Sequence, residues 1–225
     1  AVGLLIERQT GVKLSLATVG NYLAAWGLTP QKPVRRAYER DDAQIEEWRI
    51  TDYPQIAAQA KKDNASIYWA DQSRLRSDDV RGRSFALKGH TPEIAATGKR
   101  FGLNMMSAIS NRGQLVFQIF QKRFVSELFI DFAYRLIKQA KGKKVVLIVD
   151  RHAVHTSKIV QRWVGTQEGA LSMHFLPRYA PELNPDELLN NDVKWHLGNA
   201  RAKNVDQMDA NLRSHLHRRQ KQPKV

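Results

Sequence analysis

The hydrophobic pattern is strongest at residues 144–150, Lys-Val-Val-Leu-Ile-Val-Asp, where five aliphatic residues stand between a lysine and an aspartate. An unbroken apolar run of this length, rich in β-branched residues, predicts a strand that is buried on both faces of a sheet. Open α/β sheets bind ligands at the carboxyl ends of their strands, which is where Asp150 is expected. Asp150 could therefore belong to a binding site, or it could only cap the turn that follows.

The same layout occurs at residues 66–71, Ser-Ile-Tyr-Trp-Ala-Asp, a short β-prone run that we expect to end at Asp71. The rest of the pattern predicts, in order, a β-hairpin formed by 105–110 and 114–120, an amphipathic helix over 124–140, a helix over 156–164 and a strand over 171–176. The first three strands would form an antiparallel meander. Three strands followed by alternating helices and strands indicate a mixed α/β sheet.

After the last predicted strand, residues 177–187 have the sequence Pro-Arg-Tyr-Ala-Pro-Glu-Leu-Asn-Pro-Asp-Glu, in which three prolines stiffen the loop. Asn184 is suited to cap a helix that begins at Pro185, and Glu187 would then occupy the capping-box position. Glu187, Asn191 and Lys194 would share one polar face of this helix. Glu187 is thus either a helix cap or a third acid at the sheet edge.

Asp71, Asp150 and Glu187 are expected to converge at one edge of the sheet. Three carboxylates offer the all-oxygen ligands that suit Mg²⁺ or Mn²⁺. Two such ions can activate an attacking oxygen and stabilise the leaving oxygen of a phosphodiester. Without a cation, the carboxylates would repel one another and at least one pKa would rise. We therefore predict a metal-dependent site with two ions.

The first 30 residues predict a small helical unit, with a short helix over 2–7 and a second helix from Ser15 or Thr18 to Trp26. Its buried stripe is expected to consist of Leu16, Val19, Leu23 and Trp26. Two helices joined by a tight turn are compatible with a helix-turn-helix or with a plain helical hairpin. In a helix-turn-helix, the candidates for DNA contact are Lys13, Ser15, Thr18 and Asn21.

Charge favours a polyanionic partner, because 36 lysines and arginines stand against 22 acids, for a net charge of +14 and a pI near 10.1. A merely solvated basic surface is the alternative. A stiff basic linker over 29–40 could follow phosphates with Lys32, Arg35, Arg36 and Arg40. Residues 211–225 contain no acid and could contact DNA or form a disordered end.

Several classes of protein are excluded or disfavoured. The chain has no cysteine, which excludes disulfides, thiol catalysis and cysteine zinc sites. A zinc site of His152, His155 and His174 is a weak alternative for the same reason. No phosphate-loop motif accompanies the strand that ends at Asp150, so ATP chemistry is disfavoured. No apolar run reaches the roughly 20 residues that span a bilayer, and no signal peptide is evident.

Residues 148–156 and 176–187 resemble the catalytic core of insertion-sequence transposases of the mariner superfamily. These are DDE enzymes with a ribonuclease-H-like fold, and the 36 residues between Asp150 and Glu187 are close to the spacing of that family. The resemblance implies an α/β, ribonuclease-H-like mixed five-stranded sheet with flanking helices, preceded by a small helix-turn-helix unit. It assigns metal binding and catalysis to Asp71, Asp150 and Glu187, with Mg²⁺ or Mn²⁺ as the cofactor.

The function implied is that of a DNA transposase, in which water and then a freed 3′-hydroxyl attack phosphodiesters to cut and join transposon ends. Double-stranded DNA, as transposon ends and a TA target, and a second copy of the chain are the implied partners. Arg151, Asn191 and Lys194 are further candidates for DNA contact. The alternatives are a catalytically inactive DNA-binding remnant and a structure-selective nuclease on the same fold. We expect no membrane association and a cytoplasmic location at the bacterial nucleoid.

The chain departs from the family pattern at three positions, where relatives usually have Glu for Gln72, Asn for Arg151 and Trp for Asn190. Arg151 could compete with a metal for Asp150 or hold a phosphate. Since the family has a further helix-turn-helix before the one seen here, we expect that the chain is truncated. The predicted domains are 1–30 (partial helix-turn-helix), 31–64 (basic linker and connecting helices), 65–205 (catalytic domain) and 206–225 (basic tail).

Overall fold

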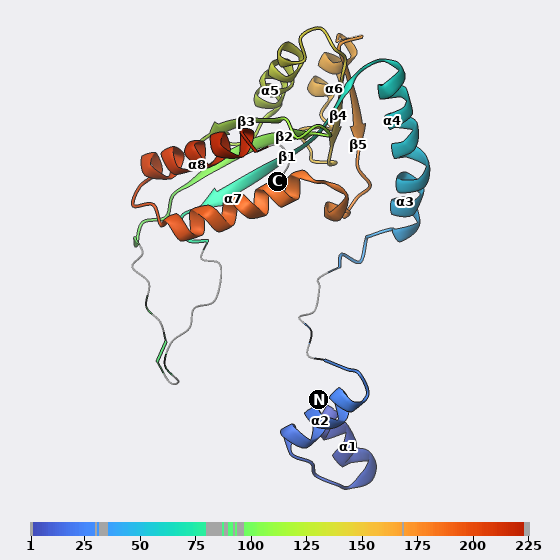
Figure 1. The fold of residues 1–225 in the computed structure, drawn as a ribbon, viewed down its shortest axis with the longest axis vertical. Coiled ribbons are helices and arrows are strands. Elements are labelled where there is room, and N and C mark those ends of the chain that lie inside the picture. Colours follow the sequence, from blue (N-terminus) through green and yellow to red (C-terminus); the bar gives the residue numbers. More distant parts are fainter. Residues whose placement is uncertain are drawn as a thin grey trace. The chain divides into compact units, whose positions relative to one another are not determined.

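The computed structural model of the chain describes residues 2–29, 31, 36–79, 87, 90–91, 93, 97–167 and 169–222 (Figure 1). It divides into two compact units, Ala1–Tyr38 and Glu39–Val225. Lys32 and Arg35, which we predicted to contact DNA, lie outside the described residues.

The first unit consists of two helices, α1 (Val2–Thr10) and α2 (Leu16–Ala25). Ser15 caps α2, since its Oγ accepts a hydrogen bond from the backbone N–H of Thr18 at 3.1 Å. The predicted buried stripe of α2 is confirmed for Val19 and wrong for Leu16 and Trp26. Within this unit α2 packs against α1, but Leu16 is 89% and Trp26 69% exposed.

The second unit is built on a five-stranded sheet with strand order β3-β2-β1-β4-β5. Strands β1, β2 and β3 are antiparallel neighbours, and β4 is parallel to both β1 and β5. The mixed five-stranded sheet and the antiparallel meander are therefore confirmed. The strands are β1 (Ser66–Arg76), β2 (Gly102–Ser110), β3 (Leu115–Phe120), β4 (Val145–Val149) and β5 (Leu171–Phe175).

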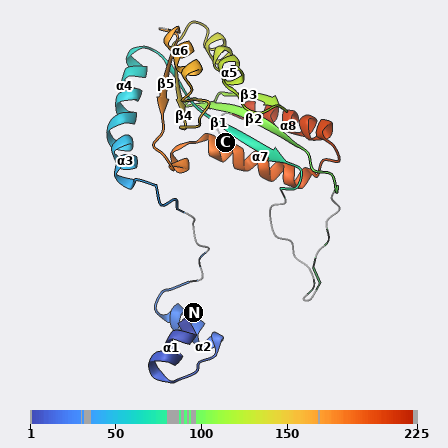
Figure 2. The same ribbon diagram turned by 180° about the vertical axis from the view of Figure 1, so that it is seen from behind.

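Helices cover both faces of this sheet (Figures 1 and 2). All five residues of β4 are buried, and alternate residues pack into different clusters, because successive side chains of a strand point to opposite faces. On one face lie α5 (Ser126–Gln139) and α6 (Lys158–Gly165). The opposite face is covered by α3 (Asp42–Glu47), a π-helical turn (Trp48–Asp52), α4 (Tyr53–Lys62), α7 (Asp186–Ala200) and α8 (Val205–Gln220).

Strand β1 is longer than predicted and runs on to Arg76, so Asp71 lies in the middle of the strand and not at its end. Its side chain points to the face where Ile67, Trp69 and Leu75 also pack, because these residues are two or four positions away. On the neighbouring strand, Ser107 of β2 stands opposite Asp71. Asp71 is therefore fixed on the face that α7 covers.

The last part of the chain was predicted to contact DNA or to be disordered, and the prediction of disorder is wrong for the described residues up to 222. Helix α8 packs Met208, Leu212 and Leu216 against β2, β3 and α7. An ion-pair network adds to this contact: Asp192 of α7 accepts hydrogen bonds from His215 at 2.6 Å and from Arg219 at 2.8 Å. In the described part of the chain, no helix is long and apolar enough to cross a membrane.

Candidate active site

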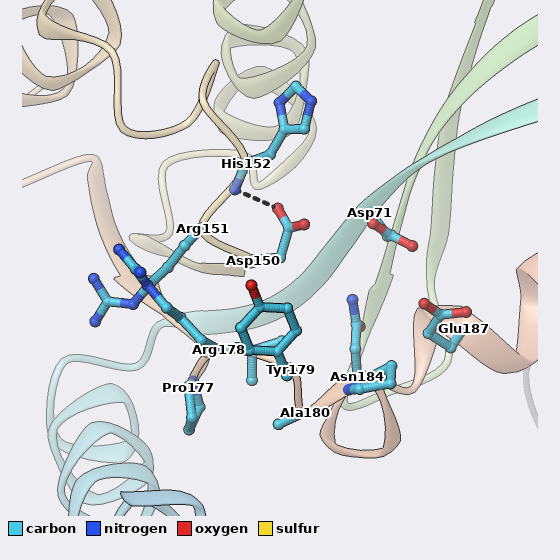
Figure 3. A pocket seen from close by; sticks show the side chains of 12 residues that line it. Asp71, Asp150, Arg151, His152, Pro177, Arg178, Tyr179, Ala180, Asn184 and Glu187 are labelled. Carbon is cyan, nitrogen blue, oxygen red and sulfur yellow. Dashed lines mark hydrogen bonds between the residues drawn. The ribbon is translucent and has the colours of Figure 1, made fainter. Parts of the chain in front are cut away.

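Asp71, Asp150 and Glu187 line one cavity of about 480 Å³ (Figure 3). They come from three different elements: the middle of β1, the residue after β4 and the first turn of α7. The loop from Leu176 to Pro181 forms another wall of the cavity. The structure thus brings together the three acids that the sequence singled out.

Asp71 is largely buried and has an uncharged partner. The side-chain amide Nδ2 of Asn190 donates a hydrogen bond to Asp71 Oδ2 at 2.7 Å. Burial, followed by the negative charges of Glu187 and Asp150, raises the pKa of Asp71 from 3.8 to about 6. Among the described residues, Asp71 therefore has an uncharged hydrogen-bond partner and no lysine or arginine that pairs with it.

Asp150 is held by the turn that follows β4. Its Oδ1 accepts a hydrogen bond from the backbone N–H of His152 at 3.1 Å, and His155 Nδ1 lies 2.8 Å from the same oxygen. Nδ1 of the fully buried His155 also faces the backbone oxygen of Asp150 at 3.2 Å, so this nitrogen carries the proton. Burial is the largest single influence and raises the pKa of Asp150, but the hydrogen bond and charge of His155, together with the backbone N–H and charge of His152, outweigh burial and lower the pKa below its ordinary value. Asp150 therefore caps the turn and also faces the cavity.

Glu187 is the second residue of α7, which begins at Asp186 and not at Pro185. The backbone N–H of Asn184 is bonded to the oxygen of Pro181, and the Asn184 side chain accepts from the backbone N–H of Asp186 at 3.1 Å. Asn184 therefore caps this turn without a capping-box bond from Glu187. The Glu187 carboxylate is left to face the cavity near the positive end of the helix dipole.

A fourth acid, Asp186, was missed by the sequence reasoning. It is fully buried, and its Oδ2 accepts a hydrogen bond from Ser107 Oγ at 2.6 Å. Burial raises its pKa well above the ordinary value, and the charges of Asp71 and Glu187 act in the same direction. Its position was predictable, because Asp186 precedes the buried Leu189 and Val193 by three and seven residues and so lies on the inward face of α7.

The three candidate ligands are all carboxylates, the oxygen donors that suit a hard divalent cation. Within the described residues, however, no three His, Asp or Glu side chains are grouped closely enough to hold a metal ion, and this includes Asp71, Asp150 and Glu187. The three carboxylates would therefore have to move closer together to bind ions jointly. The zinc alternative fails on position as well. His174 lines a different cavity, beside Trp48 and Gln59, and does not meet His152 or His155.

Comparison with known proteins identifies the family. Residues 66–209, more than half of the chain, match the model of the DDE superfamily endonucleases. The chain belongs to this family. Residues 1–51 match the model of the winged helix-turn-helix. A search of curated proteins finds no match to this DDE endonuclease.

Solved structures of the Mos1 transposase are among those that resemble this DDE endonuclease. A pre-cleavage Mos1 transpososome has a TM-score of 0.69 at 16% identity, covering 96% of this chain and 67% of the other. A Mos1 paired-end complex with the left transposon end has a TM-score of 0.65 at 15% identity, covering 100% and 72%. The Mos1 mariner catalytic domain has a TM-score of 0.54 at 13% identity, covering 83% and 85%. This likeness confirms the ribonuclease-H-like fold.

Arg40, one of the predicted DNA contacts, is paired within the protein. Its guanidinium pairs with Glu182 at 2.6 Å and with Asp42 at 2.7 Å, and it donates to the backbone oxygen of Tyr179 at 2.9 Å. The side chain is only 15% exposed. Arg40 therefore ties the segment before α3 to the loop that borders the cavity of this endonuclease.

The other predicted DNA contacts lie at different places. Arg151 is exposed at the cavity and stacks over the ring of Phe175 at 5.4 Å; Figure 3 shows that it points away from the Asp150 carboxylate. It does not occupy the place of a metal between the acids. Asn191 and Lys194 are outside the residues that line the cavity. In the first unit, Lys13 and Asn21 are exposed, whereas the hydroxyls of Ser15 and Thr18 bond each other at 2.8 Å.

Two residues of the cavity wall were not singled out by the sequence. Arg178 and Tyr179 are both exposed, and Figure 3 shows the Tyr179 hydroxyl directed towards Asp150. Tyr179 has a φ of +56°, a left-handed conformation that is uncommon for a residue other than glycine. Such strain persists where surrounding contacts impose it, and here Arg40 holds the Tyr179 carbonyl.

Proposed function

We propose that this DDE endonuclease is a DNA transposase that cuts and joins the ends of a transposon. The convergence of Asp71, Asp150 and Glu187 in one cavity supports this proposal above all. The similar solved structures add support, because they include a Mos1 paired-end complex and a Mos1 strand-transfer complex. Two reactions would share the site: water attacks a phosphodiester and frees a 3′-hydroxyl, and this hydroxyl then attacks a phosphodiester of the target.

The three acids would hold two Mg²⁺ or Mn²⁺ ions. Bound ions of this kind polarise the scissile phosphate, favour deprotonation of the attacking oxygen and stabilise the leaving one. Mos1 structures have been solved with Mn and with Mg. In this chain, His155 keeps Asp150 ionised, and the first turn of α7 presents Glu187. The raised pKa of Asp71 is consistent with a site that lacks its cation.

DNA would reach the site along the exposed cations of the cavity wall, Arg151 and Arg178. Asn191 and Lys194 on α7 would contact the flanking backbone, and Lys13, Ser15, Thr18, Asn21 and Arg36 would contribute to binding elsewhere on the duplex. Pairing of two transposon ends would require a homodimer. Bacterial nucleoid DNA is the expected place of action.

Nicking of supercoiled plasmid tests the chemistry without knowledge of the transposon ends. We expect nicking with Mn²⁺ and none with EDTA. Asp150→Asn and Glu187→Gln should each lower the rate at least about 100-fold while DNA affinity is retained, because the substitutions remove ligands and not phosphate contacts. Asp131→Asn, at an exposed carboxylate of α5, is the matched control. An Asp150→Asn variant that nicks at the wild-type rate would contradict the site assignment.

Strand joining separates a transposase from its two alternatives. A labelled duplex with a free 3′-hydroxyl should become covalently attached to plasmid DNA in the presence of Mn²⁺. Nicking without joining would indicate a structure-selective nuclease. Salt-dependent DNA binding with neither reaction would indicate an inactive remnant.

A further inference from the structure

Four polar side chains attach the start of α7 to β1 and β2, and we call them the polar seam: Ser107, Asn184, Asp186 and Asn190. Ser107 donates to Asp186 at 2.6 Å, Asn190 donates to Asp71 at 2.7 Å, and Asn184 Nδ2 lies 3.5 Å from the backbone oxygen of Ala70. All four are buried. The seam lies beside the cavity, and one of its members touches a candidate metal ligand directly.

That member, Asn190, is only 1% exposed and stands between Leu189 and Val193 on the inward face of α7. A buried amide costs free energy unless it is hydrogen-bonded, and an apolar side chain would satisfy this position by packing alone. Asn190 Oδ1 has no partner among the described atoms, so the bond from Nδ2 to Asp71 is the interaction that offsets the burial of this side chain. The hydrogen bond to Asp71 therefore explains why an amide, and not an apolar side chain, occupies this buried position.

We propose that Asn190 is a positioning residue for Asp71. Rotation of a carboxylate about its last torsion has only broad minima, so a free Asp71 would lose conformational freedom when a cation binds. Asn190 Nδ2 bonds to this carboxylate and restricts its rotation. Because an amide is uncharged, it leaves the full negative charge of Asp71 to a cation, as a lysine or arginine partner would not. This inference rests on the proposed function, since it assigns Asp71 to the metal.

Mn²⁺ affinity of the full chain without DNA tests this role, measured by electron paramagnetic resonance of free Mn²⁺. Partners behind metal ligands are worth 10- to 100-fold in affinity, so Asn190→Leu, which keeps the volume but has no donor, should bind Mn²⁺ at least about 10-fold more weakly. Asn190→Ala should weaken Mn²⁺ binding by a similar factor. Asn199→Ala is the matched control on the same helix, because Asn199 is exposed and its side chain donates to the backbone oxygen of Trp195, one turn earlier in that helix.

Nicking at increasing Mn²⁺ gives a second readout. The half-saturating Mn²⁺ concentration should rise by the same factor as the dissociation constant, with a rate at saturation within a few-fold of the wild type. A purely structural role would lower the melting temperature without moving that concentration. Wild-type Mn²⁺ affinity in both Asn190 variants, or failure of both to fold, would overturn the inference.

Asp71→Asn separates this inference from the proposed function. If that variant loses Mn²⁺ binding and nicking while the Asn190 variants behave as the wild type, the proposed metal site is supported and the positioning role of Asn190 is refuted. If Asp71→Asn itself binds Mn²⁺ and nicks as the wild type does, the proposed site is wrong, and the inference falls with it.

Discussion

Replacement of Asp71 by asparagine should stabilise the metal-free protein while it abolishes nicking. The Asp71 carboxylate is buried beside Glu187 and Asp150 and has no cationic partner among the described residues. Asparagine has nearly the same shape, does not ionise and keeps an oxygen that can accept from Asn190 Nδ2. The substitution therefore removes the charge and leaves the packing and the hydrogen bond in place.

The size of the effect follows from the pKa of Asp71, which burial and the two neighbouring carboxylates raise from 3.8 to about 6. Between these values the folded state binds more protons than the unfolded state, so stability falls as the pH rises through this window. Each pKa unit corresponds to about 1.4 kcal/mol, so the ionised carboxylate costs up to about 3 kcal/mol above pH 6. For a unit of this size, that is a rise of roughly 6–12 °C in the melting temperature of Asp71→Asn.

Thermal unfolding in EDTA at several pH values tests this reasoning. At about pH 8, Asp71→Asn should melt well above the wild type, and the difference should vanish below pH 3.8, where the Asp71 carboxyl is protonated in both the folded and the unfolded chain. Asp131→Asn should leave the melting temperature within about 1 °C at every pH, as is usual for an exposed site. An Asp71→Asn variant no more stable than the wild type at pH 8 would refute the account.

Four further outcomes can be measured. Saturating Mn²⁺ should raise the melting temperature of the wild type but not of Asp71→Asn, since only the folded wild type binds the ion. His155→Gln should move the acid limb of the nicking pH profile to higher pH, because the pKa of Asp150 rises without the His155 bond; an unmoved limb would contradict this. Arg40→Ala should speed proteolysis of residues 177–183 and leave DNA affinity in binding titrations within about two-fold; a large loss of affinity would show that Arg40 contributes to DNA binding. Asp192→Ala should lower the free energy of unfolding, measured in denaturant, by about 2–3 kcal/mol, because His215 and Arg219 lose their shared carboxylate, and an unchanged value would show that the network is unimportant.

The spacing of hydrophobic residues along the chain predicted the fold well where both faces of an element are covered. Strand β4 and the β2–β3 hairpin were predicted within a few residues, because their inward side chains are nearly all apolar. The end of β1 was missed, since Arg74 and Arg76 are exposed and Leu75 is the only apolar residue there. Helix α8 was missed because its basic composition obscured three apolar residues at a spacing of four, Met208, Leu212 and Leu216.

The candidate site was predictable only in part. The acids could be found from residue type and spacing, because carboxylates after apolar runs are conspicuous in a sequence. The side chains that hydrogen-bond to these acids could not be found in this way. Asn190 lies 119 residues from Asp71 along the chain, and His155 acts on Asp150 only because the turn after β4 folds its ring inward. Such pairings depend on how α7 and β1 pack, which no local pattern encodes.

The charge distribution around the site argues against a purely structural role for the acids. The chain carries a net charge of +14, so cationic partners are abundant. Yet among the described residues no lysine or arginine pairs with the three acids, and Arg151, the nearest candidate in sequence, stacks on Phe175 instead. Asp71 is held by an uncharged amide, although an ion pair would lower its raised pKa. A protein optimised for stability alone would neutralise these carboxylates, whereas a site that must bind a cation keeps them free of lysine and arginine partners.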